Sequence, residues 1–135
     1  MEVLKQIPNP ITPLEIMSMI ESGDIDSKYL YALKCQTDFS DDIISGWLNM
    51  NVKTYRQYKK KVTTISADVQ EHAIMLLALM KHGEEVFGSK ESFTFWLDTE
   101  NFLVGNKKPM AYLNTINGIQ FIDDRLTAME YGDNI

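Results

Sequence analysis

The sequence predicts an all-α fold, and three observations lead to this expectation. Helix-capping residues recur along the chain, and the clearest case is Thr12–Glu15, a capping box with proline at the first helical position. Between residues 67 and 87 the apolar side chains recur at spacings of three, four and seven, which is typical of the buried face of a helix. No segment shows the sustained alternation of apolar and polar residues that a half-buried strand requires.

Cap and turn residues divide the chain into successive helices. Ser22-Gly23 ends the helix that Thr12 begins, and Ser40, Asn51 and Ser66 each cap a later one. Near the C-terminus, Asn117-Gly118 reads as a turn before the last helix. The expected helices are residues 13–21, 27–35, 41–48, 52–61 and 67–87, a short helix after Ser89, one or two turns from Pro109, and a last helix between Gly118 and Gly132.

Composition bounds the class of protein. The chain has 135 residues, of which 44% are hydrophobic and 24% charged, so it can bury a core as one domain. It carries 13 Lys and Arg against 19 Asp and Glu, a net charge of −6. An acidic total argues at first against nucleic acid, because phosphate binding depends on Lys and Arg. The single Cys35 excludes an internal disulfide, no apolar run could span a bilayer, and no signal peptide is evident, so we expect a cytoplasmic protein.

The segment from Asp41 to Lys60 has the pattern of a DNA-binding helix-turn-helix. Such a unit needs a small residue where its two helices approach each other and a left-handed backbone at the turn. Ser45 supplies the small residue, and Asn49 is the non-glycine residue that best tolerates the left-handed conformation. Apolar residues expected between the two helices are Ile44, Leu48, Met50, Tyr55 and Tyr58.

Local charge favours this interpretation over an ordinary helical hairpin. Residues 50–67 include five basic residues and no acidic one, a local charge of +5, so the rest of the chain carries 8 − 19 = −11. Five like charges on a short helix repel one another unless a polyanion offsets them. The alternative is a protein-interaction module whose helix-turn-helix is a degenerate scaffold. The residues expected to contact operator DNA are Asn51, Lys53, Thr54, Arg56, Gln57, Lys59, Lys60 and Lys61.

Other reactive residue types give no catalytic or metal site. His72 and His82 are ten residues apart, whereas two His ligands on one helix need a spacing of four. Cys35 has no His partner nearby in sequence, and acidic pairs such as Asp123-Asp124 resemble solvated charges more than an acid/base dyad. The aromatic residues between 93 and 96 are expected in the core. We therefore expect no enzymatic activity, no cofactor and no metal.

Beyond residue 85 a series of residues follows a specific order. The series is Val86-Phe87-Gly88, Trp96-Leu97, Asn101, Val104-Gly105, Pro109, Leu113-Asn114-Thr115, Gly118, Ile122, Leu126 and Tyr131-Gly132. In this order it resembles the toxin-binding domain of the Xre/MbcA/ParS antitoxins, which follows an Xre-like helix-turn-helix. Three residues depart from the family pattern, in which alanine, proline and glycine are usual at the places of Gly83, Phe102 and Asn106. Asn106 can still adopt the positive φ of a glycine.

The resemblance implies an antitoxin of the RES-Xre type II toxin-antitoxin systems. Such a protein blocks a RES-domain toxin that acts on NAD, and it represses its own operon as a transcriptional repressor. A homodimer is expected, because one helix-turn-helix reads only a half-site. By position in the family, the toxin contacts are the loop 105–108 and the last helix with its Tyr131-Gly132 end. The apolar face of that helix is expected in the core, which leaves its polar residues and the tail for the partner. The expected toxin contacts are Gly105, Lys107, Lys108, Arg125, Glu130, Tyr131, Gly132 and Asp133. The implied organisation is an N-terminal helical extension (1–24), an Xre-like helix-turn-helix (25–65), a connecting long helix (66–87) and a small helical toxin-binding domain (88–135).

Overall fold

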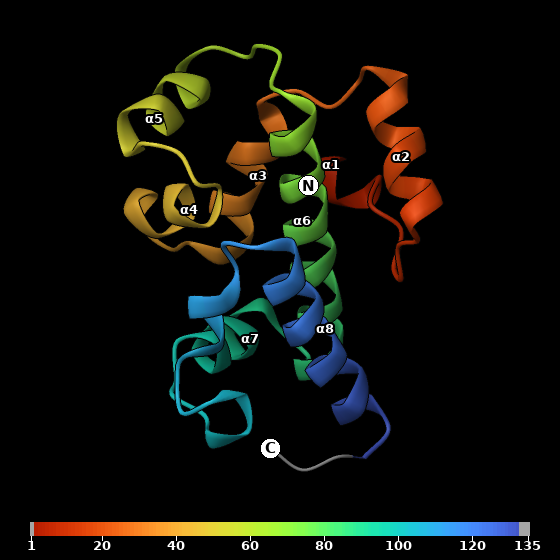
Figure 1. The fold of residues 1–135 in the computed structure, drawn as a ribbon, viewed down its shortest axis with the longest axis vertical. Coiled ribbons are helices and arrows are strands. Elements are labelled where there is room, and N and C mark those ends of the chain that lie inside the picture. Colours follow the sequence, from red (N-terminus) through yellow and green to blue (C-terminus); the bar gives the residue numbers. More distant parts are fainter. Residues whose placement is uncertain (1, 133–135) are drawn as a thin grey trace.

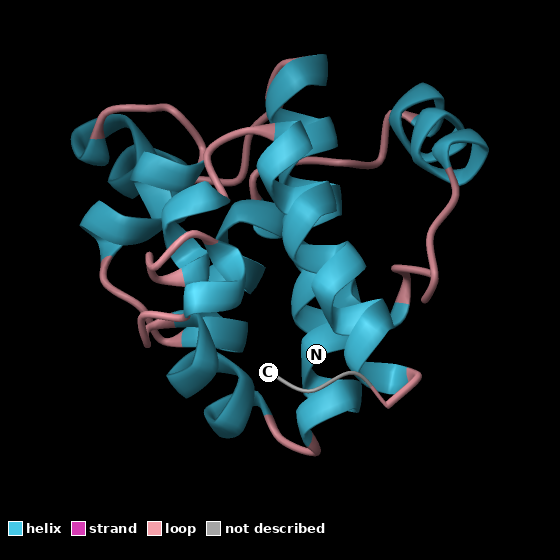
Figure 2. Ribbon diagram, turned by 60° about the horizontal axis from the view of Figure 1, so that its bottom comes forward, coloured by secondary structure: helices cyan, strands magenta, loops and turns pink. Residues whose placement is uncertain are grey.

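The computed structural model describes residues 2–132, and their regular elements are all helices (Figures 1 and 2). The all-helical expectation is therefore confirmed. The helices are α1 (Glu2–Lys5), α2 (Pro13–Ser22), α3 (Lys28–Thr37), α4 (Asp41–Trp47), α5 (Val52–Lys60), α6 (Ala67–Phe87), α7 (Lys90–Leu97), the short 3-10 helices η1 (Phe102–Val104) and η2 (Pro109–Tyr112), and α8 (Ile116–Glu130).

The core is built around α6, which extends along much of the molecule (Figure 1). Ser66 caps its first turn by accepting a hydrogen bond from the Val69 amide, and Gly88 ends it with φ of 87°. Helices α2, α3, α7 and α8 all pack against it. Its buried residues are His72, Ala73, Ile74, Leu76, Leu77, Leu79, Met80 and Gly83. The bounds expected for this helix are confirmed.

Helix α8 lies beside α6 and runs in the same direction. His72 Nε2 lies 2.9 Å from the carbonyl oxygen of Leu113, just before α8, and His82 contacts Asp123 and Glu130 farther along both helices. The apolar face of α8 is almost completely covered through Ile119, Ile122 and Leu126. Helix α8 is therefore part of the core and not a detached arm.

The N-terminal segment is tied to α6. Ile7 is 1% exposed, and Lys81 Nζ donates hydrogen bonds to the carbonyl oxygens of Leu4 and Ile7 at 3.2 and 2.6 Å. Asn9 Nδ2 donates to Glu85 Oε2 at 2.6 Å. This segment carries α2 to a position beside α6, where the two views show α2 standing somewhat apart from the rest (Figures 1 and 2).

Two expectations about the C-terminal part are wrong. Asn117-Gly118 does not precede the last helix, because Thr115 Oγ1 accepts a hydrogen bond from the Gly118 amide at 2.9 Å and so caps a helix that begins at Ile116. Phe95 is not in the core: it is 75% exposed, since Phe93 and Trp96 occupy the inward face of α7. Two short helices, α1 and η1, are absent from the expected set, and the ends of the expected helices differ by one or two residues.

Candidate functional site

The turn between α4 and α5 has the conformation that its sequence predicts. Asn49 has φ of 57°, and the Met50 amide donates to the Ser45 carbonyl at 3.1 Å across the turn. Asn51 Oδ1 accepts from the Lys53 amide at 2.7 Å and caps α5. Of the five apolar residues expected between the helices, Ile44, Leu48 and Tyr55 are buried, and Met50 and Tyr58 are partly buried against the core.

The positive charge of α5 is partly balanced from within the chain. Asp41, at the start of α4, lies 3.0 Å from Lys59 Nζ, 3.1 Å from Arg56 Nε and 3.9 Å from Lys34 Nζ. Hydrogen bonds from Lys59 and then Arg56 hold the pKa of Asp41 below its usual value. The repulsion among the basic residues of α5 is therefore relieved in part by a carboxylate nine residues before the basic segment that starts at residue 50. The charge pattern alone is a weaker indication of DNA than the sequence suggests.

The rest of the predicted DNA-contacting residues face solvent. Asn51, Lys53, Thr54, Gln57, Lys60 and Lys61 are all exposed. Arg56 is also exposed beside Asp41, whereas Lys59 is 23% exposed with its Nζ 5.4 Å from the centre of the Tyr55 ring. Three of these lysines, Lys53, Lys60 and Lys61, make no side-chain hydrogen bond or ion pair within residues 2–132. These three lysines are therefore free to meet an anionic partner.

Part of the predicted toxin surface is the loop that follows η1. Gly105 and Asn106 both have positive φ, at 84° and 61°, so Asn106 adopts the conformation expected of it. The Asn101 amide donates to the Lys107 carbonyl at 3.1 Å, and Tyr112 Oη donates to the Val104 carbonyl at 2.6 Å. These bonds close the loop on itself and hold it in one shape.

The two lysines of this loop have different surroundings. Lys108 pairs with Asp98 at 2.8 Å, and this hydrogen bond raises the pKa of Lys108. Lys107 is exposed, with its Nζ 5.9 Å from the centre of the Tyr112 ring. Lys107 is therefore the more accessible of the two charges.

The end of α8 carries the other predicted toxin contacts. Tyr131 is 87% exposed, and Gly132 follows it with φ of 91°. Arg125 is partly buried and has an interaction partner, so it is not a free surface charge. Asp133 lies outside the described residues. Among these residues Tyr131 is the most accessible side chain.

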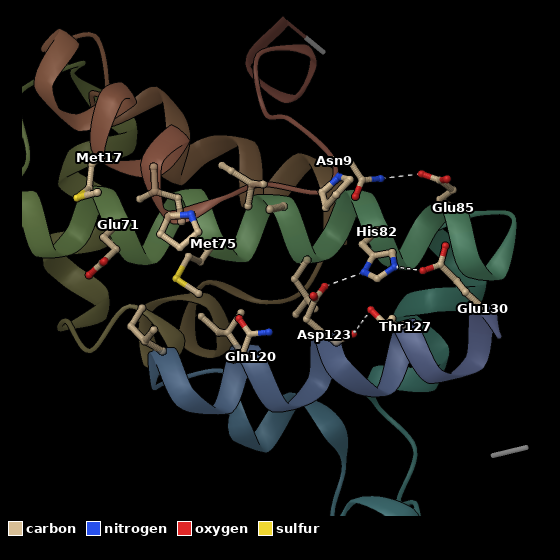
Figure 3. Close-up of a pocket in the computed structure, with 18 of the residues that line it drawn as sticks. Asn9, Met17, Glu71, Met75, His82, Glu85, Gln120, Asp123, Thr127 and Glu130 are labelled. Carbon is tan, nitrogen blue, oxygen red and sulfur yellow. Dashed lines mark hydrogen bonds and ion pairs between the residues drawn. The ribbon is translucent and has the colours of Figure 1, made fainter. Parts of the chain in front are cut away.

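His82 joins α6 to the end of α8, an arrangement that the sequence analysis missed. Its Nδ1 lies 2.7 Å from Asp123 Oδ1 and its Nε2 lies 2.6 Å from Glu130 Oε1 (Figure 3). Burial lowers the pKa of His82, but the hydrogen bonds to Asp123 and Glu130 raise it by more, so the net direction is upward. Both contacts are hydrogen bonds only when the imidazole carries two protons. The one sequence signal for this cluster is the spacing of seven between Asp123 and Glu130, which places them on one face of α8.

The two predicted surfaces lie far apart. In Figure 1, α5 lies in the upper half of the molecule, whereas the loop after η1 and the end of α8 both lie at its lower end. The structure thus brings the predicted toxin residues to one end of the molecule and keeps them away from the basic helix. A side chain of the α4–α5 turn nevertheless reaches the C-terminal part, since Asn49 Nδ2 donates to the Asn114 carbonyl at 2.8 Å.

Two kinds of site do not occur within the part of the chain that is described. No helix there has the length and apolar character needed to cross a membrane. Nor does any group of three or more His, Cys, Asp or Glu residues there form a metal-binding cluster. His72 and His82 each contact other residues, as reported above.

The C-terminal residues match a known domain family. Residues 82–132 match the family model of the antitoxin Xre/MbcA/ParS C-terminal toxin-binding domain. No curated protein matches the chain. The matched segment takes in the last part of α6 together with α7, η1, η2 and α8. It supports the antitoxin family for this part of the chain and implies a toxin as partner, and residues 1–81 lie outside it.

Proposed function

We propose that the chain is the antitoxin of a type II toxin-antitoxin system and that its toxin is a RES-domain enzyme acting on NAD. The match of residues 82–132 to the toxin-binding domain carries this proposal. The structure is compatible with it, because the loop 105–108 and Tyr131 are exposed at the same end of the molecule. The antitoxin acts by binding the toxin and covering its NAD pocket, and it needs no catalytic group, cofactor or metal of its own.

Neutralisation is tested by producing the chain together with the RES-domain protein encoded beside it. The RES protein alone should deplete NAD, and the wild-type chain should prevent this. Tyr131→Ala should weaken toxin binding about tenfold or more, because a large exposed aromatic side chain is a typical hot spot. Tyr31→Ala is the matched control, since Tyr31 is also exposed but lies on α3. Undiminished NAD depletion in the presence of the wild-type chain would reject the proposed function.

Deletion of α8 is a poor test of the same surface. Ile122 and Leu126 are completely buried, so removal of the helix would uncover the core beside α6. Exposure of so much apolar surface would unfold the chain and remove every activity at once. Single substitutions of exposed residues separate the toxin surface from the fold.

We further propose that α5 docks in operator DNA and that a homodimer represses the chain's own operon. The supporting observations are the left-handed turn at Asn49, the cap at Asn51 and the exposed lysines Lys53 and Lys60. The acidic remainder of the chain would repel DNA elsewhere, so binding should be weak unless two copies act together.

A second function is favoured by the contacts of Asp41. Because Asp41 pairs with Arg56 and Lys59, the α4–α5 unit could be a scaffold for protein interaction that does not bind DNA. A gel shift with DNA from upstream of the chain's own operon decides between the two. Lys53→Glu with Lys60→Glu should abolish the shift, whereas Lys28→Glu with Lys90→Glu alters the net charge equally and should preserve it. No shift with the wild-type dimer would favour the scaffold.

A further inference from the structure

A groove of about 680 Å³ runs along α6, between the N-terminal segment and α8 (Figure 3). Its floor is apolar and includes Ile16, Met75, Leu79 and Ile119. Met17 of α2 also lines it and is 54% exposed. The groove therefore offers a half-covered apolar surface to a partner. Most of its α2 side lies outside the segment that matches the toxin-binding family.

The charged side chains that line the groove are nearly all acidic. Among the described residues they are Glu71, Glu85, Asp123 and Glu130, with His82 as the single cationic candidate and no Lys or Arg. With His82 protonated the lining carries 1 − 4 = −3 charges. Asn9 donates to Glu85 and His82 faces both Asp123 and Glu130, so three of the four carboxylates are held in place. Each keeps further lone pairs to accept hydrogen bonds from a ligand.

The apolar floor and the acidic rim of the groove together indicate what kind of partner would bind in it. Aliphatic side chains would cover Met75 and Leu79, and Lys or Arg side chains would lie between the carboxylates of α6 and α8. A helix with one apolar face and basic flanks meets both requirements. DNA does not, because its phosphates would face a net negative lining.

We propose that this groove is a second contact site for the toxin and that it binds a basic amphipathic segment of that protein. The proposal rests on the proposed function, since the occupant is the toxin itself. It places the toxin along α6 from the end of α8 to α2, so that Glu130 and Tyr131 join this contact to the exposed end of the molecule. The N-terminal helices then contribute to toxin binding as well as to the fold.

One pair of substitutions on α2 tests the groove directly. Met17 and Leu14 are both exposed apolar residues of this helix, at 54% and 69%, but only Met17 lines the groove. Met17→Lys introduces a positive charge where the basic segment would lie and removes apolar surface. Leu14→Lys makes the same change in net charge away from the groove. We expect Met17→Lys to weaken binding of the purified RES-domain protein about tenfold or more, and Leu14→Lys to leave it unchanged.

Removal of groove carboxylates is the complementary test. Glu71→Gln with Glu85→Gln should weaken toxin binding and reduce its dependence on salt, whereas Glu21→Gln with Glu91→Gln, both away from the groove, should do neither. Circular dichroism and a thermal scan of each variant establish that it is folded, and only folded variants are compared.

The outcomes separate this proposal from the proposed function. If the wild-type chain binds no toxin, the proposed function fails and the groove proposal fails with it. If the wild-type chain binds but folded Met17→Lys binds equally well, only the groove proposal is overturned. If Met17→Lys instead changes the sedimentation of the free chain, the groove is a contact between two copies, which also overturns the proposal.

Discussion

Gly83→Ala should destabilise the chain, although glycine is a poor residue for the interior of a helix. Gly83 lies within α6, where replacement by alanine would normally add about 1 kcal/mol to the free energy of unfolding. A Cβ at this position would lie 2.3 Å from Cδ2 and Cε2 of the Phe93 ring. Carbon atoms prefer a separation of about 3.5–4.0 Å, so the ring would have to move by more than about 1 Å.

The surroundings of Phe93 leave the ring little room to move. Phe93 is 1% exposed, and the centres of the Phe87 and Trp96 rings lie 5.8 and 6.0 Å from its own. Overpacking of a core lowers the free energy of unfolding by about 1–3 kcal/mol, and a ring displacement of this size should cost close to the upper end of that range. We therefore expect a net loss of about 2 kcal/mol, which corresponds to roughly 8 °C in melting temperature for a chain of this size.

Gly46→Ala is the matched control for this substitution. Gly46 is in helix α4, its φ is not positive, and a Cβ there would meet nothing within 4 Å. Gly46→Ala should raise the free energy of unfolding by up to about 1 kcal/mol, whereas Gly83→Ala should lower it. Urea unfolding of wild type and both variants measures this. Equal stabilisation by the two substitutions would refute the steric argument, and Phe93→Leu should relieve the cost of Gly83→Ala in a double-mutant cycle.

Three further predictions concern charge and packing. The pKa of His82 is raised in the folded chain, so protonated His82 stabilises the fold fully below the unfolded pKa of about 6.5, and this stabilisation is lost as the pH rises through the folded pKa. The loss of unfolding free energy caused by His82→Gln, measured by urea unfolding, should therefore be smaller at pH 9 than at pH 6. A deficit that is the same at both pH values would contradict this. Asp41→Asn should lower the free energy of unfolding by about 1 kcal/mol in the same assay. It should also tighten operator binding in a gel shift, because it frees Arg56 and Lys59. Weaker DNA binding by the folded variant would exclude α5 as the docking helix. Gly118→Ala should lower the free energy of unfolding by about 3 kcal/mol, since its Cβ would overlap the Tyr112 carbonyl oxygen, a backbone atom. An unchanged thermal midpoint would show that the backbone can yield.

The features that could be predicted from the sequence are those that depend on residues close together in the chain, such as turns and helix ends. Asn49 was expected to be left-handed because few other residues tolerate that conformation, and its φ of 57° confirms the expectation. The bounds of α6 follow from a serine cap and a terminal glycine, and they are also confirmed. Gly118 was misread because Asn-Gly is a strong turn signal, and the sequence does not reveal that Thr115 caps a helix across it.

Contacts between helices that are distant in the sequence could not be predicted from it. The pairing of Asp41 with Lys59 depends on how α4 packs against α5, and the pairing of His82 with Asp123 and Glu130 depends on α8 lying beside α6. The groove requires the N-terminal segment to return to α6 through Asn9 and Glu85, residues 76 positions apart. Residue types and spacing within one helix carry no information on these contacts.

The family match begins at His82, in the last part of α6, so the matched segment starts within a helix whose earlier turns pack in the same core. A continuous helix fixes rotation as well as distance between its two halves. Insertion of one residue near His82 would turn the residues that follow it in α6 by about 100° relative to those that precede it. Hybrids that exchange the segment after His82 with that of another protein must therefore keep the residue count of this helix, because its helical phase decides which side chains face α8.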